Sequence, residues 1–258
     1  MLVSDYKIAL AFLSFCAIAS AVYIFNDIFD REKDKLHKKK SSRPLSSGAV
    51  PISNAVVISV LLAGLAFGLA FLVGQTFLFV VAGYLTLNVL YSLYLKNLSL
   101  IDISCVALGF ILRVLGGGAA ADVPISKWLI LMTFLLACCL ALGKRRDDLL
   151  VYAEKESFRP ALKGYTLPFI DTCLIVLGVT TIVCYIMYTV SEDVVQRLHS
   201  DYVYLTSIFV IIGILRFLQI AIVEQKSGAP TMILLKDHMI QAMIFLWLTA
   251  FCILLYAS

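Results

Sequence analysis

Residues 26–48, NDIFDREKDKLHKKKSSRPLSSG, contain an abrupt change from an apolar run to a dense polar block. A helix would place Asn26, Asp27, Asp30 and Asp34 on one face, within about 100° of arc. Carboxylates gathered this closely repel one another unless a cation lies among them. Oxygen ligands suit Mg²⁺ better than zinc or copper, and Mg²⁺ with few protein ligands usually takes the rest from phosphate. The spacing therefore predicts a magnesium site for a phosphorylated substrate.

Basic residues follow these carboxylates directly and would attract the same anion. They are Lys33, Lys35, Lys38, Lys39, Lys40 and Arg43. The simple alternative is a solvated, charged loop that only marks the cytoplasmic side of a membrane. The carboxylate spacing at the end of an apolar helix favours a binding site over this alternative.

The composition is that of a polytopic membrane protein. Of 258 residues, 61% are hydrophobic and only 15% are charged, and the mean hydropathy is +0.96. A membrane span needs about 20 mainly apolar residues. Eight segments qualify, near residues 6–29, 51–73, 75–95, 100–120, 125–142, 165–190, 202–223 and 239–257. Because no room remains for a soluble domain, residues 1–258 are predicted to form a single, all-α transmembrane helical bundle.

The distribution of charge predicts the orientation in the membrane. Lys and Arg are concentrated in the loops after the first, third, fifth and seventh segments, whereas the opposite loops hold only Lys127 and Arg197. By the positive-inside rule, the basic loops face the cytoplasm. We therefore expect a protein of the inner cell membrane with its polar clusters on the cytoplasmic side. Nucleic acid is not expected as a partner, because no nucleic-acid-binding motif accompanies the basic residues.

Further polar residues lie in or near the third and fourth segments. Tyr91 and Lys96 close the third, where tyrosines commonly belong to an interfacial belt. Asp102 and Arg113 lie in the fourth, and ionisable groups inside a span imply a partner or a wet cavity. An Asp–Arg ion pair is one explanation, although three helical turns separate the two residues. Glycines at 116–118 lead us to expect an interruption of this helix.

A second polar block, residues 142–148 (LGKRRDD), ends the fifth segment as the first block ends the first. Both blocks are expected on the cytoplasmic side. Asp148 could form a second carboxylate set together with Tyr165 and Asp171, which begin the sixth segment.

Taken together, these motifs resemble the UbiA superfamily of intramembrane prenyltransferases, over nearly the whole chain. The first block matches the superfamily pattern NDxxDxxxD. The decaprenyl-phosphate phosphoribosyltransferase branch is favoured by YSLYLKN (91–97), the fourth-segment pattern around Asp102, Arg113 and Gly117, GKRRDDL (143–149), RPALKGYTLPFID (159–171) and APTMILLKDHMIQ (229–241). Family members have nine spans, and this chain begins at what resembles the second, so the first is either absent or cut from this sequence. Lys38 stands where the family usually has proline, and Asp148 where it usually has glutamate.

The resemblance implies Mg²⁺-dependent transfer of 5-phosphoribose from phosphoribosyl diphosphate to the phosphate of a membrane-embedded polyprenyl lipid. It implies that Asn26, Asp27, Asp30 and Asp34 hold the metal, that Asp27, Asp30, Asp34 and Asp148 are catalytic, and that Lys40 and Arg43 stabilise the leaving diphosphate. Lys144 and Arg145 would hold phosphate, Asp148 and Asp171 a second metal or ribose hydroxyls, and Lys96 and Arg113 the acceptor phosphate. Tyr91, Asp102 and Tyr165 complete the expected substrate-binding residues.

Two other functions use the same features differently. A UbiA-type prenyltransferase would move a prenyl group from prenyl diphosphate to an aromatic or other acceptor, but its second motif is normally less cationic than GKRRDDL. A transporter would be expected to place ionisable groups near the middle of several spans. Here nearly all ionisable groups are gathered on one side of the membrane, and Asp102, Arg113 and Asp171 are the main exceptions within predicted spans, which favours an enzyme.

Overall fold

The chain is helical throughout a computed structural model that describes residues 2–35, 41–152, 160–198 and 200–256, with no strand among them. Seven helices in this part are long and apolar enough to cross a membrane. The number becomes eight if Pro230–Lys236 and His238–Leu254, which meet at a 79° bend, count as one span. The eight predicted segments are confirmed in this sense, and the chain is a polytopic membrane protein.

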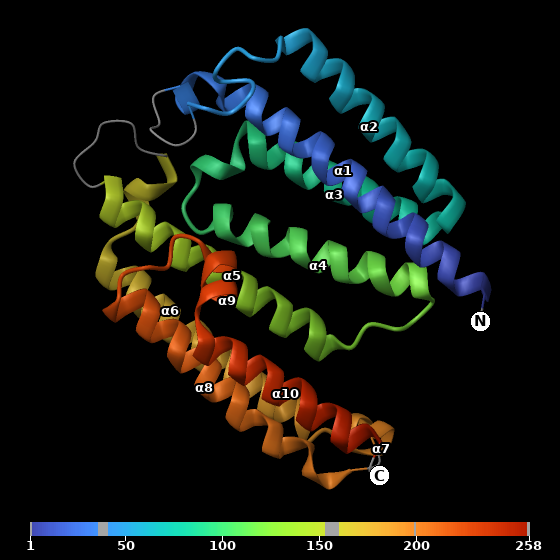
Figure 1. Cartoon of the computed structure of the whole chain (residues 1–258), viewed down its shortest axis with the longest axis vertical. Helices are drawn as coiled ribbons and strands as arrows, with labels where there is room; N and C mark the ends of the chain where they lie inside the picture. The colour runs from blue at the N-terminus through green and yellow to red at the C-terminus, as the bar shows by residue number, and fades with distance from the viewer. Residues whose placement is uncertain (1, 36–40, 153–159, 199, 257–258) are drawn as a thin grey trace. The chain divides into compact units, whose positions relative to one another are not determined.

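The chain divides into two compact units, of which the first comprises Met1–Ser126 and Glu156–Ala161. Its helices are α1 (Leu2–Lys35), α2 (Ile52–Val73), α3 (Gln75–Leu93), the short 3-10 turn η1 (Leu95–Asn97) and α4 (Ile101–Ala121). Figure 1 shows α1 running along α2, and α1 also contacts α3 and α4. The 34 residues of α1 extend for about 51 Å, compared with a bilayer hydrocarbon core of about 30 Å. The predicted continuation of this helix into the carboxylate face is confirmed.

Small residues allow α1 and α2 to pack closely. Ala17 on α1 and Ala66 and Ala70 on α2 are buried. Ser14 donates a hydrogen bond of 2.8 Å from its hydroxyl to the carbonyl of Ala66, directly across the helix pair. Small interfacial residues and interhelical hydrogen bonds are what hold transmembrane helices together, because lipid provides no hydrophobic driving force between them. This packing fixes the helix that carries the first polar block.

The predicted interruption of the fourth segment was wrong, because α4 continues through residues 116–118 to Ala121. A Cβ atom on Gly116 would collide with the ring of Phe15 and approach Phe77 to 3.3 Å. A Cβ atom on Gly118 would likewise overlap Ile125. Two of the three glycines therefore lie where neighbouring side chains press against the helix. Close packing explains them, and tertiary contacts outweigh their low helix propensity.

The second unit comprises Lys127–Lys155 and Leu162–Ser258. Its long helices are α5 (Lys127–Tyr152), α6 (Leu167–Thr189), α8 (Ser207–Leu218) and α10 (His238–Tyr256). Figure 1 also shows the short α7 (Glu192–Leu198) and α9 (Pro230–Lys236). The 3-10 segments are η2 (Pro160–Gly164), where the chain passes from one unit to the other, and η3 (Asp201–Thr206). α8 continues as a π-helical segment, η4 (Gln219–Val223).

An ion pair fixes the bend between α9 and α10. Asp237, at the bend, accepts hydrogen bonds of 3.1 and 2.7 Å from Nε and Nη2 of Arg216 on its Oδ2 atom. Its Oδ1 atom accepts from the backbone amide of Ile240 at 2.9 Å and so caps the start of α10. Arg216 also pairs with Glu224 at 2.8 Å. Asp237 at the bend is therefore held by the Arg216 side chain and by the backbone amide of Ile240.

Candidate active site

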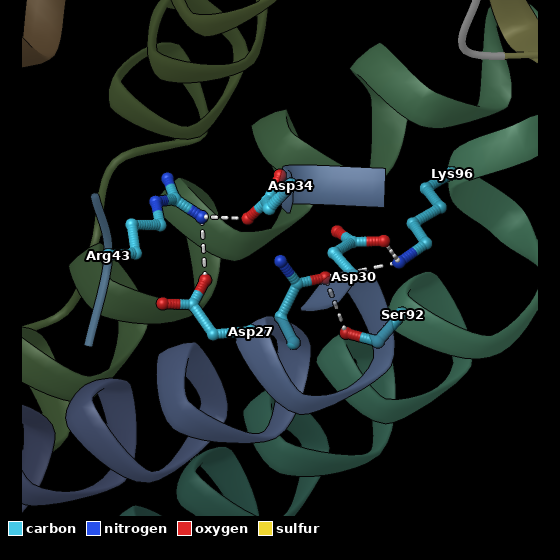
Figure 2. A network of polar contacts seen from close by, with 7 residues as sticks. Asp27, Asp30, Asp34, Arg43, Ser92 and Lys96 are labelled. Atoms are coloured by element: carbon cyan, nitrogen blue, oxygen red, sulfur yellow. Dashed lines mark hydrogen bonds and ion pairs between the residues drawn. The ribbon is translucent and has the colours of Figure 1, made fainter. Parts of the chain in front are cut away.

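The first polar block forms a cluster at the C-terminal end of α1. Figure 2 shows Asp27, Asp30 and Asp34 projecting from this helix toward Arg43, Ser92 and Lys96. Arg43 comes from the loop after α1, Ser92 from the last turn of α3, and Lys96 from η1. The cluster therefore joins three parts of the first unit, and we call it the carboxylate cluster.

Arg43 connects two of the carboxylates through a single nitrogen. Its Nη1 atom donates to Oδ1 of Asp27 at 2.7 Å and to Oδ2 of Asp34 at 2.8 Å. Asp34 is nearly enclosed, with 6% of its side chain exposed, compared with 29% for Asp27 and 39% for Arg43. A charge-assisted pair with one partner this buried holds the loop firmly against the helix.

Lys96 forms the second half of the cluster. Its ammonium group donates to Oδ1 of Asp30 at 2.7 Å and to Oδ1 of Asn26 at 3.3 Å. The hydroxyl of Ser92 donates to the same Asn26 oxygen at 3.3 Å. Lys96 is buried, so its charge depends on Asp30 for compensation. The structure thus brings Lys96 together with the predicted metal ligands.

The side-chain oxygen atoms of the carboxylate cluster are of the kind that bind a divalent cation. No group of three or more His, Cys, Asp or Glu side chains within the described residues is arranged to hold a metal ion as it stands. Arg43 and Lys96 instead divide the oxygen ligands into two pairs. Nevertheless, Asp27 and Asp34 already share one positively charged atom, Nη1 of Arg43. Oxygen ligands that converge on a single cation are what Mg²⁺ requires.

Arg113 lies in a different environment within the first unit. Its Nη2 atom donates to the hydroxyl of Tyr84 at 2.8 Å, and its guanidinium carbon lies 5.4 Å from the Tyr84 ring centroid and 5.3 Å from that of Phe110. Cation–π contacts of this kind stabilise a partly desolvated cation. Asp102 is fully buried in the first turn of α4. Tyr91 is half-buried on the last turn of α3.

The second polar block is arranged as two ion pairs in the second unit. Arg145 and Asp148, one turn apart on α5, pair at 3.1 Å. Arg146 donates from Nε to Oδ1 of Asp171 on α6 at 2.6 Å, and from Nη2 to the carbonyl of Ile222 at 3.5 Å. These contacts tie α5 to α6 and to η4. Asp171, expected to bind substrate or metal, is therefore engaged with Arg146.

The remaining expected site residues lie as follows. Lys144 is exposed beside Arg145, and Tyr165 is buried where η2 leads into α6, with its ring stacked on that of Phe169 at 6.3 Å between centroids. Lys40 lies outside the described residues.

Three residues of these clusters were missed by sequence reasoning: Ser92, Tyr84 and Arg146. Ser92 lies in the YSLYLKN motif one turn before Lys96, so its position was a usable signal. Arg146 adjoins Arg145, but neighbouring residues on a helix point about 100° apart. The sequence alone does not say which of the two faces α6. Nothing in the sequence around Tyr84 indicates its contact with Arg113.

The fold and the two polar clusters together define a class of integral membrane protein. Similarity to known sequences identifies this class. The sequence profile described as the UbiA prenyltransferase family matches residues 3–151, and the chain belongs to this family.

Among curated proteins, the chain is similar to the "Decaprenyl-phosphate phosphoribosyltransferase" of Mycolicibacterium smegmatis, with 30% identity over 98% of this chain and 81% of that protein. It is also 29% identical to the protein of the same name from Corynebacterium glutamicum, over 96% and 75% of the two chains. The predicted resemblance is confirmed by these matches.

Solved structures support the same fold. A UbiA homolog from Archaeoglobus fulgidus bound to GPP and Mg²⁺ matches with a TM-score of 0.73 at 18% identity, covering 96% of this chain and 87% of that one. A UbiA homolog from Aeropyrum pernix K1 matches with a TM-score of 0.66 at 16% identity, covering 94% and 95%. At these identities the likeness concerns the fold.

Proposed function

We propose that this protein transfers 5-phosphoribose from phosphoribosyl diphosphate to the phosphate of a polyprenyl lipid, with Mg²⁺, at the cytoplasmic face of the inner membrane. The observation that carries the proposal is the carboxylate cluster, in which oxygen ligands and two cations lie within hydrogen-bonding distance of one another. A diphosphate with its metal needs both kinds of group. The relatives named decaprenyl-phosphate phosphoribosyltransferase, which match nearly the whole chain, support the choice of substrates.

The transfer requires little acid–base chemistry from the protein. The bond from C1 of the ribose to the diphosphate oxygen breaks, the diphosphate leaves with the electron pair, and an oxygen of the acceptor phosphate bonds to C1. Because this oxygen is already anionic, no strong general base is needed. The carbon becomes cationic and the leaving group becomes more negative, so electrostatic stabilisation of the diphosphate is the main catalytic requirement.

The carboxylate cluster would meet this requirement in the first unit. Asn26, Asp27, Asp30 and Asp34 would hold Mg²⁺, which when bound neutralises charge on the leaving diphosphate. Arg43, once it exchanges its carboxylate partners for phosphate oxygens, would bind the same group. A guanidinium suits this task because it donates several hydrogen bonds in one plane.

In the second unit, Lys144 and Arg145 would hold a phosphate group of a substrate. Lys144 is exposed at the end of α5, and Arg145 is held beside it by Asp148. Arg146 is engaged with Asp171 and Ile222, so we assign it to positioning this end of α5 against α6. Lys96 and Arg113, in the first unit, remain the candidates for the acceptor phosphate; Arg113 contacts the hydroxyl and the ring of Tyr84.

The second candidate is transfer of a prenyl group from a prenyl diphosphate, which the fold shared with the GPP-bound homolog supports. Membranes containing the protein should be incubated with labelled phosphoribosyl diphosphate and decaprenyl phosphate, and separately with labelled prenyl diphosphate and an aromatic acid. We expect a labelled phosphoribosyl lipid in the first reaction and no product in the second. The reverse result would refute the proposed function in favour of prenyl transfer.

A variant tests the role of the carboxylate cluster in the same membranes. Asp30→Ala removes one expected metal ligand and leaves Lys96 without its carboxylate partner. We expect Mg²⁺-dependent transfer to fall to background while the protein remains in the membrane at a normal level. Retained transfer would contradict the assignment of the metal to this cluster.

A further inference from the structure

The chain between α8 and α9 packs against the C-terminal end of α5, within the second unit. It consists of residues 219–229, which form η4 and the loop that follows, and we call it the η4 segment. The hydroxyl of Ser227 is buried and donates to the carbonyl of Gly143 at 2.6 Å. The carbonyl of Ile222 accepts from Nη2 of Arg146 at 3.5 Å. The η4 segment is therefore bonded to α5 at two points that lie about one helical turn apart.

Gly228 makes a third contact with α5, at a place where a side chain would not fit. A Cβ atom at this position would collide with the carboxylate of Asp147. Rotation of the carboxylate alone would not make room, because the Cβ atom of Asp147 would still lie only 3.0 Å away. Glycine allows the backbone to come this close to another group. The loop therefore presses directly on the helix that carries the second polar block.

The η4 segment contacts only one face of the second polar block. The residues on this face are Gly143, Arg146 and Asp147. The residues to which we assign a substrate role are Lys144, Arg145 and Asp148. Because successive residues of an α-helix are about 100° apart, each set of three falls within about 100° of arc, and the two arcs do not overlap. The motif GKRRDDL (143–149) thus has one face packed against the protein and another that carries the proposed substrate-binding residues.

The backbone of the η4 segment adopts two uncommon conformations. The amide of Glu224 bonds to the carbonyl of Gln219 at 3.1 Å, which closes a π-helical turn, a form often found at functional sites. Gln225 follows with a φ of 57°, in the left-handed region where residues other than glycine are strained. The amide of Lys226 then bonds to the carbonyl of Ile220 at 3.1 Å. Such conformations persist where surrounding contacts hold them, and the contacts with α5 are among these.

An ion pair fixes the other side of the loop. Arg216 on α8 contacts Glu224 at 2.8 Å and Asp237, at the bend between α9 and α10, at 2.7 Å. One guanidinium group therefore connects the start of the loop with the helices before and after it. Because Arg216 holds the loop at Glu224 and α5 holds it at Ser227, the η4 segment forms a fixed support for the end of α5.

We infer that the η4 segment is a positioning element, which sets the rotation of the end of α5 and so directs Lys144 and Arg145 toward a substrate phosphate. The inference rests on the proposed function, in which these two cations hold such a group. A rotation of about 20° would move an atom about 6 Å from the helix axis by about 2 Å. A misplacement of about 1 Å can lower a rate about 100-fold. Ser227 and Gly228 act through α5 and need not touch the substrate.

Gly228→Ala tests the inference, because the added methyl group pushes the loop and α5 apart. We expect kcat/KM for phosphoribosyl transfer to fall about tenfold or more. Gly213→Ala, on α8 in the same unit, is the matched control and should leave the value unchanged, because its Cβ atom would meet only Met243, at 4.0 Å. Ser227→Ala removes only the hydroxyl contact of 2.6 Å and replaces Gly228→Ala if that variant does not fold.

A double-mutant cycle with Lys144→Gln distinguishes positioning from a general loss of folded protein. If the η4 segment acts through Lys144, Gly228→Ala should raise the same substrate's KM as Lys144→Gln does. The double variant should then be little worse than the poorer of the two single variants. A merely structural role would reduce the amount of active protein in both backgrounds, so the two losses would multiply. Multiplied losses would overturn the inference.

A second cycle tests the steric cause of the effect. Asp147→Ala removes the carboxylate with which the new Cβ atom would collide. In the Asp147→Ala background, Gly228→Ala should cost no more than about threefold in kcat/KM, compared with about tenfold or more in the wild-type background. An equal cost in both backgrounds would overturn the assignment of positioning to this contact.

Inorganic pyrophosphate allows a measurement without turnover. Calorimetric titration in EDTA removes metal-dependent binding at the carboxylate cluster. We expect Lys144→Gln and Gly228→Ala each to weaken pyrophosphate binding and to be non-additive, and Gly213→Ala to have no effect. No difference between Gly228→Ala and Gly213→Ala would overturn the inference. If the expected pattern is found but no phosphoribose is transferred to lipid, the proposed function fails while the positioning role stands.

Discussion

Replacing Arg43 with Gln tests whether this residue occupies the place of the metal. The substitution removes the hydrogen bonds of 2.7 and 2.8 Å to Asp27 and Asp34. A hydrogen bond to a charged group contributes about 1.5–3 kcal/mol, but exposure of Arg43 and Asp27 reduces this. Asp34 is 6% exposed and would lose this charge-assisted contact in a nearly enclosed position. We estimate a loss of about 2 kcal/mol in the free energy of unfolding, measured in EDTA.

The free energy that the Arg43 contacts contribute to folding should be recovered as tighter Mg²⁺ binding in the variant. In the wild-type protein, a Mg²⁺ ion bound by Asp27 and Asp34 must displace Arg43, whereas in Arg43→Gln it need not. A difference of about 2 kcal/mol corresponds to roughly 30-fold in a dissociation constant. We therefore expect Arg43→Gln to bind Mg²⁺ up to about 30-fold more tightly and to be stabilised more by saturating Mg²⁺. Transfer activity should nevertheless fall, because the diphosphate loses a proposed partner.

Thermal unfolding in EDTA and in Mg²⁺ measures the change in stability. Calorimetric titration of Mg²⁺ in detergent measures the change in affinity. Lys35→Gln is the control, because Lys35 contacts Glu32 at 2.8 Å but Glu32 is 74% exposed. Such a surface pair contributes less than about 1 kcal/mol. Weaker Mg²⁺ binding by Arg43→Gln than by wild type would refute the reasoning, since Arg43 would then support the metal instead of competing with it.

Two further predictions concern stability. Arg146→Met and Asp171→Asn should each lower the free energy of unfolding by about 2 kcal/mol, because 95% of the Arg146 side chain is enclosed and either substitution leaves one charge of the pair alone. The double variant should lose about 1 kcal/mol less than the sum of the two single losses. Additive losses in reversible unfolding would argue against the pair. Gly116→Ala should destabilise the protein by about 1–3 kcal/mol through overlap with a neighbouring ring, whereas Gly117→Ala, with no atom within 4 Å, should be neutral or stabilising. Equal melting temperatures for these two alanine variants would contradict the packing account of α4.

Local patterns were sufficient to predict the spans and the carboxylate face. Each span is a continuous apolar segment, and Asn26, Asp27, Asp30 and Asp34 share a face because helix geometry depends only on spacing. The prediction of a helix interruption at residues 116–118 was wrong because it used local information where the structure depends on distant contacts. Helix propensity is a local quantity, whereas the packing of Phe15 against Gly116 is not visible in either segment alone.

The partners of the charged residues could not be predicted, because they depend on tertiary structure. Lys96 is 66 residues from Asp30 in sequence, and Arg146 is 25 residues from Asp171. The pairing of Arg145 with Asp148 is local, at a spacing of three residues on one helix. The sequence identified the charged residues of the carboxylate cluster and those of the second cluster except Arg146, but the fold determines which of them compensate one another.

The two clusters follow one electrostatic rule, each within its own unit. Asp27 and Asp34 are compensated by Arg43, and Asp30 by Lys96. In the second unit, Arg145 and Arg146 each have a carboxylate partner as well. A buried charge left alone would cost several kcal/mol, so each pair avoids the cost of an isolated charge when no substrate is bound. A metal–diphosphate complex carries charges of both signs, so it can exchange partners with such pairs without leaving any of them uncompensated. Under the proposed function, this exchange would account for the interleaving of carboxylates and cations. Cations alone would bind a polyanion more strongly but would repel one another in its absence.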